Sequence, residues 1–169
     1  MRVLDLCTLD VVTIEQEALA RDAAEKLHAQ GVGSLVVVDE HGVGVGLLTD
    51  RDLALRGLHG KVHQPAGQRV ERFASSPLIS IGEKGNLQEA LEIMRVRGIR
   101  RLPVIDSEGK PAGILTLDDV VGALSSALAD LSAEAVAKRR NAIWRGRLDS
   151  AKEDLTEALS DVNNRLRST

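Results

Sequence analysis

The stretch GVGSLVVVDEHGVGVGLLTDRD, from Gly31 to Asp52, recurs as GIRRLPVIDSEGKPAGILTLDD, from Gly98 to Asp119. The offset is 67 residues throughout, in the loops as well as in the apolar runs. A repeat that keeps its register in this way predicts two copies of one structural unit, each covering the exposed face of the other. We therefore look first for a functional site in the cleft between the copies.

Apolar periodicity predicts the order β-α-β-β-α for each copy. In the first copy we expect strands over 11–14, 35–38 and 43–48, and helices over 17–30 and 50–58. In the second copy we expect strands over 78–81, 102–105 and 111–115, and helices over 87–97 and from 117. The predicted fold class is α/β (α+β): two repeats packed as a pseudo-twofold pair, followed by a C-terminal helical extension.

These elements divide the chain into a first repeat over 1–60, a linker over 61–76, a second repeat over 77–127 and a helical tail over 128–169. The stretch 57–76, which contains the linker, is rich in Gly, Pro, His and Gln, and Pro65 and Gly67 oppose a regular element in it. His59 and His63 have helical metal-ligand spacing but no evident third ligand, so we expect solvated histidines and no metal site.

The tail has an apolar stripe at three- and four-residue steps, made by Leu148, Ala151, Leu155, Leu159, Val162 and Leu166. A basic segment precedes the stripe and contains Lys138, Arg139, Arg140, Arg145 and Arg147. We expect two helices here, the first ending before Gly146, that dock a second copy or a regulated protein. Nucleic-acid binding is not expected: the basic segment fits the solvated side of a helix, and with Phe73 and Trp144 as the only aromatic residues the chain lacks platforms for stacking single strands.

Composition narrows the class of protein. The chain has 169 residues, 43% of them hydrophobic, and a formal charge of −3, which fits a globular protein. No run approaches the roughly 18 apolar residues of a membrane span, so we expect a cytoplasmic protein. The single cysteine, Cys7, has no histidine near it in sequence, and no nucleophile with an activating base is evident, so we expect no catalysis.

Each repeat contains the motif Gly-h-h-Thr-x-x-Asp, where h is apolar, at Gly46–Asp52 and Gly113–Asp119. A helix that starts after this Thr directs its free N–H groups at the strand tip, which suits a phosphate, and the Asp could accept hydrogen bonds from a ribose diol. The alternative is a helix cap, because Thr-x-x-Asp is close to a capping box. From the residues alone both interpretations stay open.

The repeated unit and its motif resemble the CBS domain, and the tandem resembles a CBS pair, or Bateman module, over residues 4–127. The resemblance implies that Thr49, Asp52, Thr116 and Asp119 contact the phosphate and ribose of adenine nucleotides. It also implies that Thr13, Ile14, Ser80, Ile81 and Pro103 supply the walls for adenine. CBS pairs commonly form disc-shaped dimers, so the resemblance implies a homodimer.

The two copies differ where phosphate charge would be neutralised. Arg100 and Arg101 precede a strand of the second copy, whereas the first copy has Gly33 and Ser34 there. Paired guanidinium groups suit bidentate phosphate contacts. Arg51 lies inside the first motif, where the second motif has the acidic Asp118. We therefore expect two unequal sites.

The function predicted from these features is a non-enzymatic regulatory module that binds AMP, ADP, ATP or a related adenosyl ligand and transmits occupancy through its packing. No obligatory cofactor is expected, and Mg²⁺ would arrive with the nucleotide rather than in a site built by the protein. The alternative is a structural dimerisation or adaptor protein, in which the Thr-x-x-Asp motifs are caps and the tail docks a partner.

Overall fold

The computed structural model describes residues 1–59 and 64–167 and divides into two compact units, Met1–Val121 and Gly122–Thr169. In the first unit, the first repeat contains β1 (Thr13–Glu15), α1 (Ala20–Gln30), β2 (Ser34–Val38), β3 (Gly44–Thr49) and α2 (Asp50–His59). The second repeat contains β4 (Ile81–Gly82), α3 (Leu87–Arg97), β5 (Arg101–Ile105), β6 (Pro111–Thr116) and the start of α4 (Leu117–Arg167). The predicted order of elements is confirmed in both repeats.

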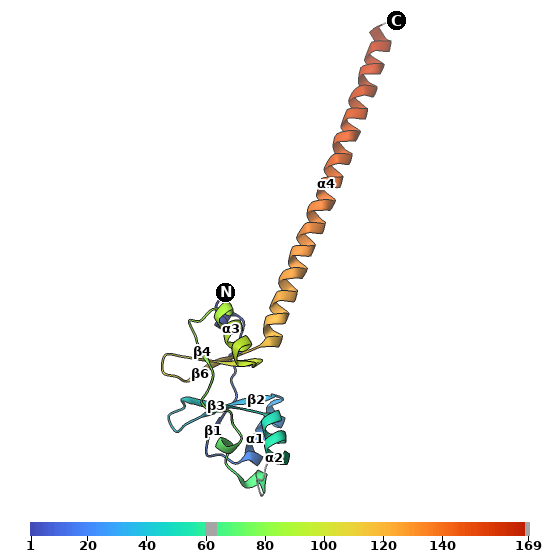
Figure 1. Cartoon of the computed structure of the whole chain (residues 1–169). Helices are drawn as coiled ribbons and strands as arrows, with labels where there is room; N and C mark the ends of the chain where they lie inside the picture. Colours follow the sequence, from blue (N-terminus) through green and yellow to red (C-terminus); the bar gives the residue numbers. More distant parts are fainter. Residues whose placement is uncertain (60–63, 168–169) are drawn as a thin grey trace. The chain divides into compact units, whose positions relative to one another are not determined.

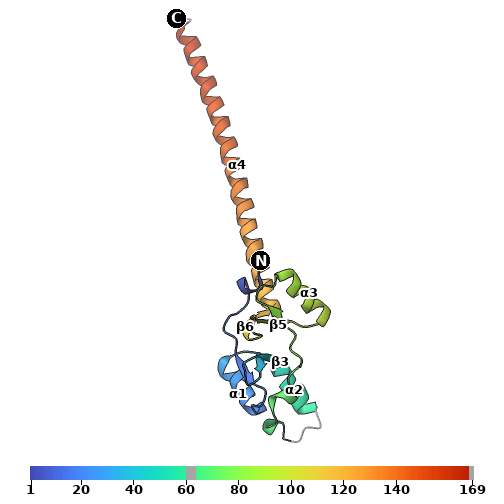
Figure 2. The ribbon, with the colours of Figure 1, turned by 90° about the vertical axis from the view of Figure 1, so that its left-hand side faces the viewer.

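Each repeat forms a three-stranded sheet, in the order β1-β2-β3 or β4-β5-β6, with its first pair parallel and its second pair antiparallel. The internal repeat extends to hydrogen-bond register: Val36 pairs with Leu47, and 67 residues later Pro103 pairs with Ile114. In Figure 1, α1 and α2 lie side by side on the face of the first sheet that points away from the second sheet. Figure 2 shows α3 next to β5.

β4 is shorter than its counterpart β1 because of Pro103. In the first sheet the N–H of Val36 donates to the carbonyl of Val12 at 3.1 Å. Proline has no N–H to donate at the matching position, so this ladder bond cannot form in the second sheet. The observed strand is accordingly only Ile81–Gly82, and it shares Ile81 alone with the strand predicted over 78–81.

Glycines end the first helix of each repeat. Gly31 and Gly98 lie in the left-handed region, with φ of 62° and 65°, where a residue with a Cβ is strained. The N–H of Gly31 donates to the last turn of α1, and that of Gly98 to the last turn of α3. This stop turns the chain directly into the central strand of each sheet.

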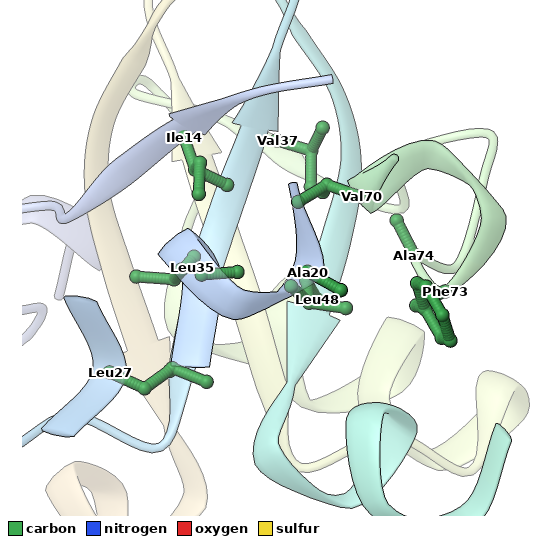
Figure 3. Packing of buried hydrophobic residues seen from close by; sticks show 10 residues of the cluster. Ile14, Ala20, Leu27, Leu35, Val37, Leu48, Val70, Phe73 and Ala74 are labelled. Atoms are coloured by element: carbon green, nitrogen blue, oxygen red, sulfur yellow. The ribbon is translucent and has the colours of Figure 1, made fainter. Parts of the chain in front are cut away.

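The segment before each repeat packs into the core of the other repeat. The first core includes Leu35 and Leu48 from its own sheet together with Val70 and Phe73 from the segment that leads to the second repeat. Figure 3 shows Val70, Phe73 and Ala74 alongside the side chains of the first repeat. In the same way Val3, which precedes the first repeat, is buried in the second core beside Leu102 and Leu115. The repeats are therefore joined by exchanged segments.

The interval predicted as a linker differs from that expectation. It contains two short 3-10 helices, Pro65–Gly67 and Val70–Arg72, and Val70 and Phe73 are 0% and 1% exposed. Burial of these apolar side chains fixes the backbone despite Pro65 and Gly67. Residues 60–63, including His63, lie outside the described residues, and of His59 only the backbone is described.

The tail prediction of two helices is wrong, because α4 runs without a break through Gly146. A glycine inside a helix costs only about 1 kcal/mol relative to alanine, and the neighbouring Ala, Arg and Leu residues favour the helix. The described part of α4 also contradicts the expectation of no long apolar stretch. Leu117–Ser150 is long and apolar enough to cross a membrane by length and composition, because an 18-residue window within it has a mean hydropathy of 1.4. A single helix of this kind does not by itself assign the protein to a membrane.

Candidate functional site

Within each motif, the Thr side chain and the Asp side chain form a hydrogen bond with each other. The Thr49 hydroxyl donates to Oδ2 of Asp52 at 2.6 Å, the same oxygen accepts the Thr49 N–H at 3.1 Å, and the Asp52 N–H donates to the Thr49 hydroxyl at 3.1 Å. Thr116 and Asp119 repeat this arrangement at 2.6, 2.8 and 3.2 Å. The motifs therefore cap helices, as the capping interpretation predicted.

The first-turn N–H groups of α2 are already hydrogen-bonded, which contradicts the expectation of free donors for a phosphate. The N–H of Asp50 donates to the Gly33 carbonyl at 3.4 Å, and that of Arg51 to the Asp50 carboxylate at 2.7 Å. The N–H groups of Thr49 and Asp52 are taken within the cap. Phosphate binding at this end of α2 would therefore fall to side chains.

A cleft of about 370 Å³ nevertheless opens beside the first motif. Three segments form it: the junction of β3 and α2, the chain before β4, and the turn from α3 into β5. Its lining consists of Leu47, Thr49, Arg51, Asp52, Ser75, Pro77, Ile79, Gly98, Ile99, Arg100 and Arg101. We call this the first cleft. Residues of both repeats line it.

Five predicted site residues meet in the first cleft: Thr49, Arg51, Asp52, Arg100 and Arg101. Three arginines thus line the same cleft as one carboxylate residue, Asp52, whose Oδ2 is engaged in the cap. An excess of cationic fork-shaped donors next to a carboxylate suits an anionic ligand that also has hydroxyl groups.

The other predicted residues do not line the first cleft. Thr116 and Asp119 belong to the corresponding place in the second repeat, and Thr13 is half-buried in β1. Ile14 and Ile81 are each 7% exposed and belong to the two cores, while Pro103 is fully buried. Ser80 lines a neighbouring surface hollow that shares Ser75, Pro77 and Ile79 with the first cleft. Apolar walls in the first cleft come instead from Leu47, Pro77, Ile79 and Ile99.

Arg56, which the sequence analysis did not single out, braces the first cleft. Its guanidinium donates to the Ala74 carbonyl at 3.0 Å and to the Ser75 hydroxyl at 3.3 Å. It also lies 3.5 Å from Oδ1 of Asp52. The i,i+4 spacing of Asp52 and Arg56 on a helix was the available signal.

The second repeat lacks these cationic groups at the matching positions. Ala123 replaces Arg56, and Asp118 replaces Arg51. The guanidinium of Arg101 lies next to Gly33 of the first repeat: a Cβ placed on Gly33 would be 2.8 Å from a nitrogen of that guanidinium. Glycine at position 33 thus leaves space for this arginine. The charged residues at corresponding positions around the two Thr-x-x-Asp motifs therefore differ, as the prediction of two unequal sites requires.

Cys7 packs against the second core next to Gly113. Burial raises the pKa of the Cys7 thiol, and the negative charge of Asp119 adds to that effect. Both influences favour the protonated thiol, which is the poorer nucleophile. Among residues 1–59 and 64–167, no three His, Cys, Asp or Glu side chains are grouped so as to hold a metal ion.

Two β-α-β-β-α repeats with exchanged N-terminal segments and a capped Thr-x-x-Asp motif in each define a tandem pair of α+β domains. The model of the CBS domain family matches residues 3–58 and 70–126, and the chain belongs to this family. The predicted tandem CBS pair with a C-terminal helix is confirmed.

Individual relatives agree with this assignment. An uncharacterized protein of Methanopyrus kandleri, MK0525, is 35% identical over 113 residues, which cover 66% of this chain and 57% of that protein. The uncharacterized protein YlbB of Bacillus subtilis is 34% identical over 120 residues, 70% of this chain and 79% of its own length. Among solved structures, CBSX2 in complex with AMP is 30% identical, with a TM-score of 0.62 over 74% of this chain and 96% of that one.

Proposed function

We propose that this protein is a non-enzymatic regulatory module that binds an adenine nucleotide in the first cleft. The observation that carries the proposal is the meeting of Asp52 with Arg51, Arg100 and Arg101 in one opening between the repeats. The AMP complex of CBSX2, a relative 30% identical to this chain, supports the choice of ligand. The proposal includes a homodimer, a cytoplasmic location and a regulated partner.

The chemistry divides among three groups of residues. The arginines would contact the phosphate through charge-assisted hydrogen bonds. Asp52 uses Oδ2 within the cap, so Oδ1 is the oxygen that would accept a ribose hydroxyl. The purine would lie against the apolar side chains of Leu47, Ile79 and Ile99. Mg²⁺ would enter with ADP or ATP, bound to the phosphates.

Transmission follows from the segments that form the cleft. The first motif belongs to one repeat and Arg100 and Arg101 to the other, so a nucleotide that contacts both adds free energy to one arrangement of the repeats. A ligand shifts such an equilibrium only by its differential affinity for the two arrangements. The first cleft is therefore suited to a sensor.

Calorimetry with AMP, ADP, ATP and S-adenosylmethionine tests the proposal. Asp52→Asn and Asp119→Asn are a matched pair, because both substitutions alter the same cap in equivalent repeats. We expect micromolar binding that Asp52→Asn weakens and Asp119→Asn leaves nearly unchanged. Thermal unfolding of both variants separates a binding effect from loss of the cap, which is worth about 1 kcal/mol.

An adaptor protein is the second candidate, favoured by the mutual bonding of Thr and Asp in both motifs. In that case none of the four ligands would bind, and the nucleotide proposal would be wrong. A nucleic-acid binder using the basic residues 138–147 would instead show affinity that falls steeply with salt, and we expect no such retardation of DNA or RNA.

A further inference from the structure

Helix α4 has an exposed apolar stripe that the nucleotide proposal does not use. Val121, Leu124, Leu128 and Leu131 are 53%, 55%, 64% and 63% exposed, and the exposed Ala135 continues the series. Their spacing alternates between three and four residues, which is the a/d pattern of a coiled coil. We call these five residues the α4 seam.

From this pattern we propose that the α4 seam pairs with the same seam of a second copy of this chain in a parallel two-stranded coiled coil. The three-residue step from Val121 to Leu124 places Val121 at an a position and Leu124 at a d position. Leu128 then occupies a, and Leu131 occupies d. Val121 at a with Leu124 at d is the combination of a β-branched residue and leucine that favours two parallel strands, whereas Leu128 and Ala135 fill the other a positions.

Charge supports the parallel arrangement. In this register Glu134 occupies a g position and Arg139 the following e position, five residues later. A parallel pair brings Glu134 of one copy next to Arg139 of the other, twice per dimer. Neither residue forms an ion pair within the part of the chain that the structure describes. Lys138 at the next d position ends the seam.

A second copy fits this stripe better than a lipid bilayer does. Asp130 and Glu134 lie on the turns that carry Leu128 and Leu131, and both carboxylates are exposed. Ionised carboxylates in the middle of a membrane span are costly. In a coiled coil Asp130 lies at an outer c position and stays in water.

Cysteine cross-linking of the full chain tests both the pairing and its direction. In a Cys7→Ser background, Leu131→Cys places a thiol at a d position, and Ala133→Cys places one on the same helix at the outer f position. A parallel coiled coil brings position 131 of the two copies together. We expect mild oxidation to give at least about tenfold more covalent dimer from Leu131→Cys than from Ala133→Cys. Equal yields, or no dimer from Leu131→Cys, would overturn the proposal.

Charge reversal provides an independent readout. Glu134→Arg should lower the dimer fraction in a sedimentation series, and the double variant Glu134→Arg, Arg139→Glu should restore it. A double variant as weak as the single one contradicts the parallel register. Fluorescence of Trp144 with phosphatidylcholine–phosphatidylglycerol vesicles tests the membrane alternative. We expect no blue shift, and a blue shift that Leu124→Lys abolishes would assign the seam to lipid. These outcomes do not depend on nucleotide binding.

Discussion

The guanidinium of Arg56 lies 3.5 Å from Oδ1 of Asp52 and also holds the backbone of Ala74 and the side chain of Ser75. One arginine thus connects the carboxylate of the first cleft to the segment that leads into the second repeat. The equivalent carboxylate, Asp119, has Ala123 one turn later and lacks this brace. The repeats therefore share a fold while differing in how firmly each carboxylate is oriented.

Removal of this brace should weaken nucleotide binding. Arg56→Ala eliminates the bond to the Ala74 carbonyl and the ion pair with Oδ1 of Asp52, while the cap still holds Oδ2. A hydrogen bond contributes about 1 kcal/mol, so we expect about fivefold weaker AMP binding by calorimetry. Arg95→Ala is the matched control, because Arg95 is exposed and pairs with Glu92, away from the first cleft. Equal effects of the two substitutions would argue against the orienting role of Arg56.

The arginines of the first cleft should favour ligands that carry a phosphate over ligands that do not. Arg100→Ala should weaken AMP binding by about tenfold or more, because a charge-assisted hydrogen bond contributes about 1.5–3 kcal/mol. Binding of adenosine, which has no phosphate, should change little. Titration of both ligands into both proteins measures the difference. Parallel losses for AMP and adenosine would show that Arg100 acts on the fold or on the nucleoside instead.

The packing of the segment after the first repeat into the first core should contribute to the free energy of unfolding. Phe73 is 1% exposed and packs in the first core although it follows the first repeat in the chain. Phe73→Ala should lower the free energy of unfolding by about 3–5 kcal/mol, measured by chemical denaturation. Arg72→Ala, next to it and exposed, is the control. A loss below about 1 kcal/mol for Phe73→Ala would be inconsistent with this packing.

Gly113 and Cys7 form a close contact that requires a small residue. A Cβ at position 113 would lie 2.5 Å from Sγ of Cys7 and 3.3 Å from the Thr8 carbonyl. Gly113→Ala should therefore destabilise the protein by about 1–3 kcal/mol, as overpacking does. The double variant Gly113→Ala, Cys7→Ala should recover part of this loss because the sulfur is removed. Thermal unfolding of the four proteins measures the coupling, and strictly additive effects would exclude the contact as the cause.

The Cys7 thiol should react slowly with thiol reagents. Its pKa is raised mainly by burial, so the thiolate is depleted at pH 8 relative to a free cysteine and becomes populated only as the pH rises through the raised value. We expect labelling by a disulfide reagent to be slower than that of glutathione at pH 8 and to accelerate in denaturant. Equally fast labelling of the folded protein and glutathione would contradict this assignment.

The repeat made most of the architecture predictable. Helix α3 has the predicted bounds, Leu87–Arg97, because its apolar spacing, its Asn86 cap and Gly98 are all local signals. β4 was expected to be longer than it is. The expectation failed because the missing N–H of Pro103 acts on a strand more than 20 residues away in the chain. Gly146 was expected to end a helix, but a single glycine costs too little to break one.

The candidate site was predictable only in its polar half. Thr49, Asp52, Arg100 and Arg101 stood out because the repeats make their positions comparable. Pro77, Ile79 and Ile99 did not, since apolar residues that flank strands look alike whether they line a core or a cleft. Ile14 and Ile81 were assigned to the adenine walls and lie in the cores instead.

The sequence by itself determined the two copies, their order of elements and the position of the Thr-x-x-Asp motif in each, because these depend on periodicity and on local residue spacing. Tertiary structure alone decided that the junction of β3 and α2, the chain before β4 and the turn from α3 into β5 meet at one cleft. It also decided that Phe73 and Val3 complete the opposite cores. These features depend on how segments distant in the chain exclude water and fill space together, which no local pattern encodes.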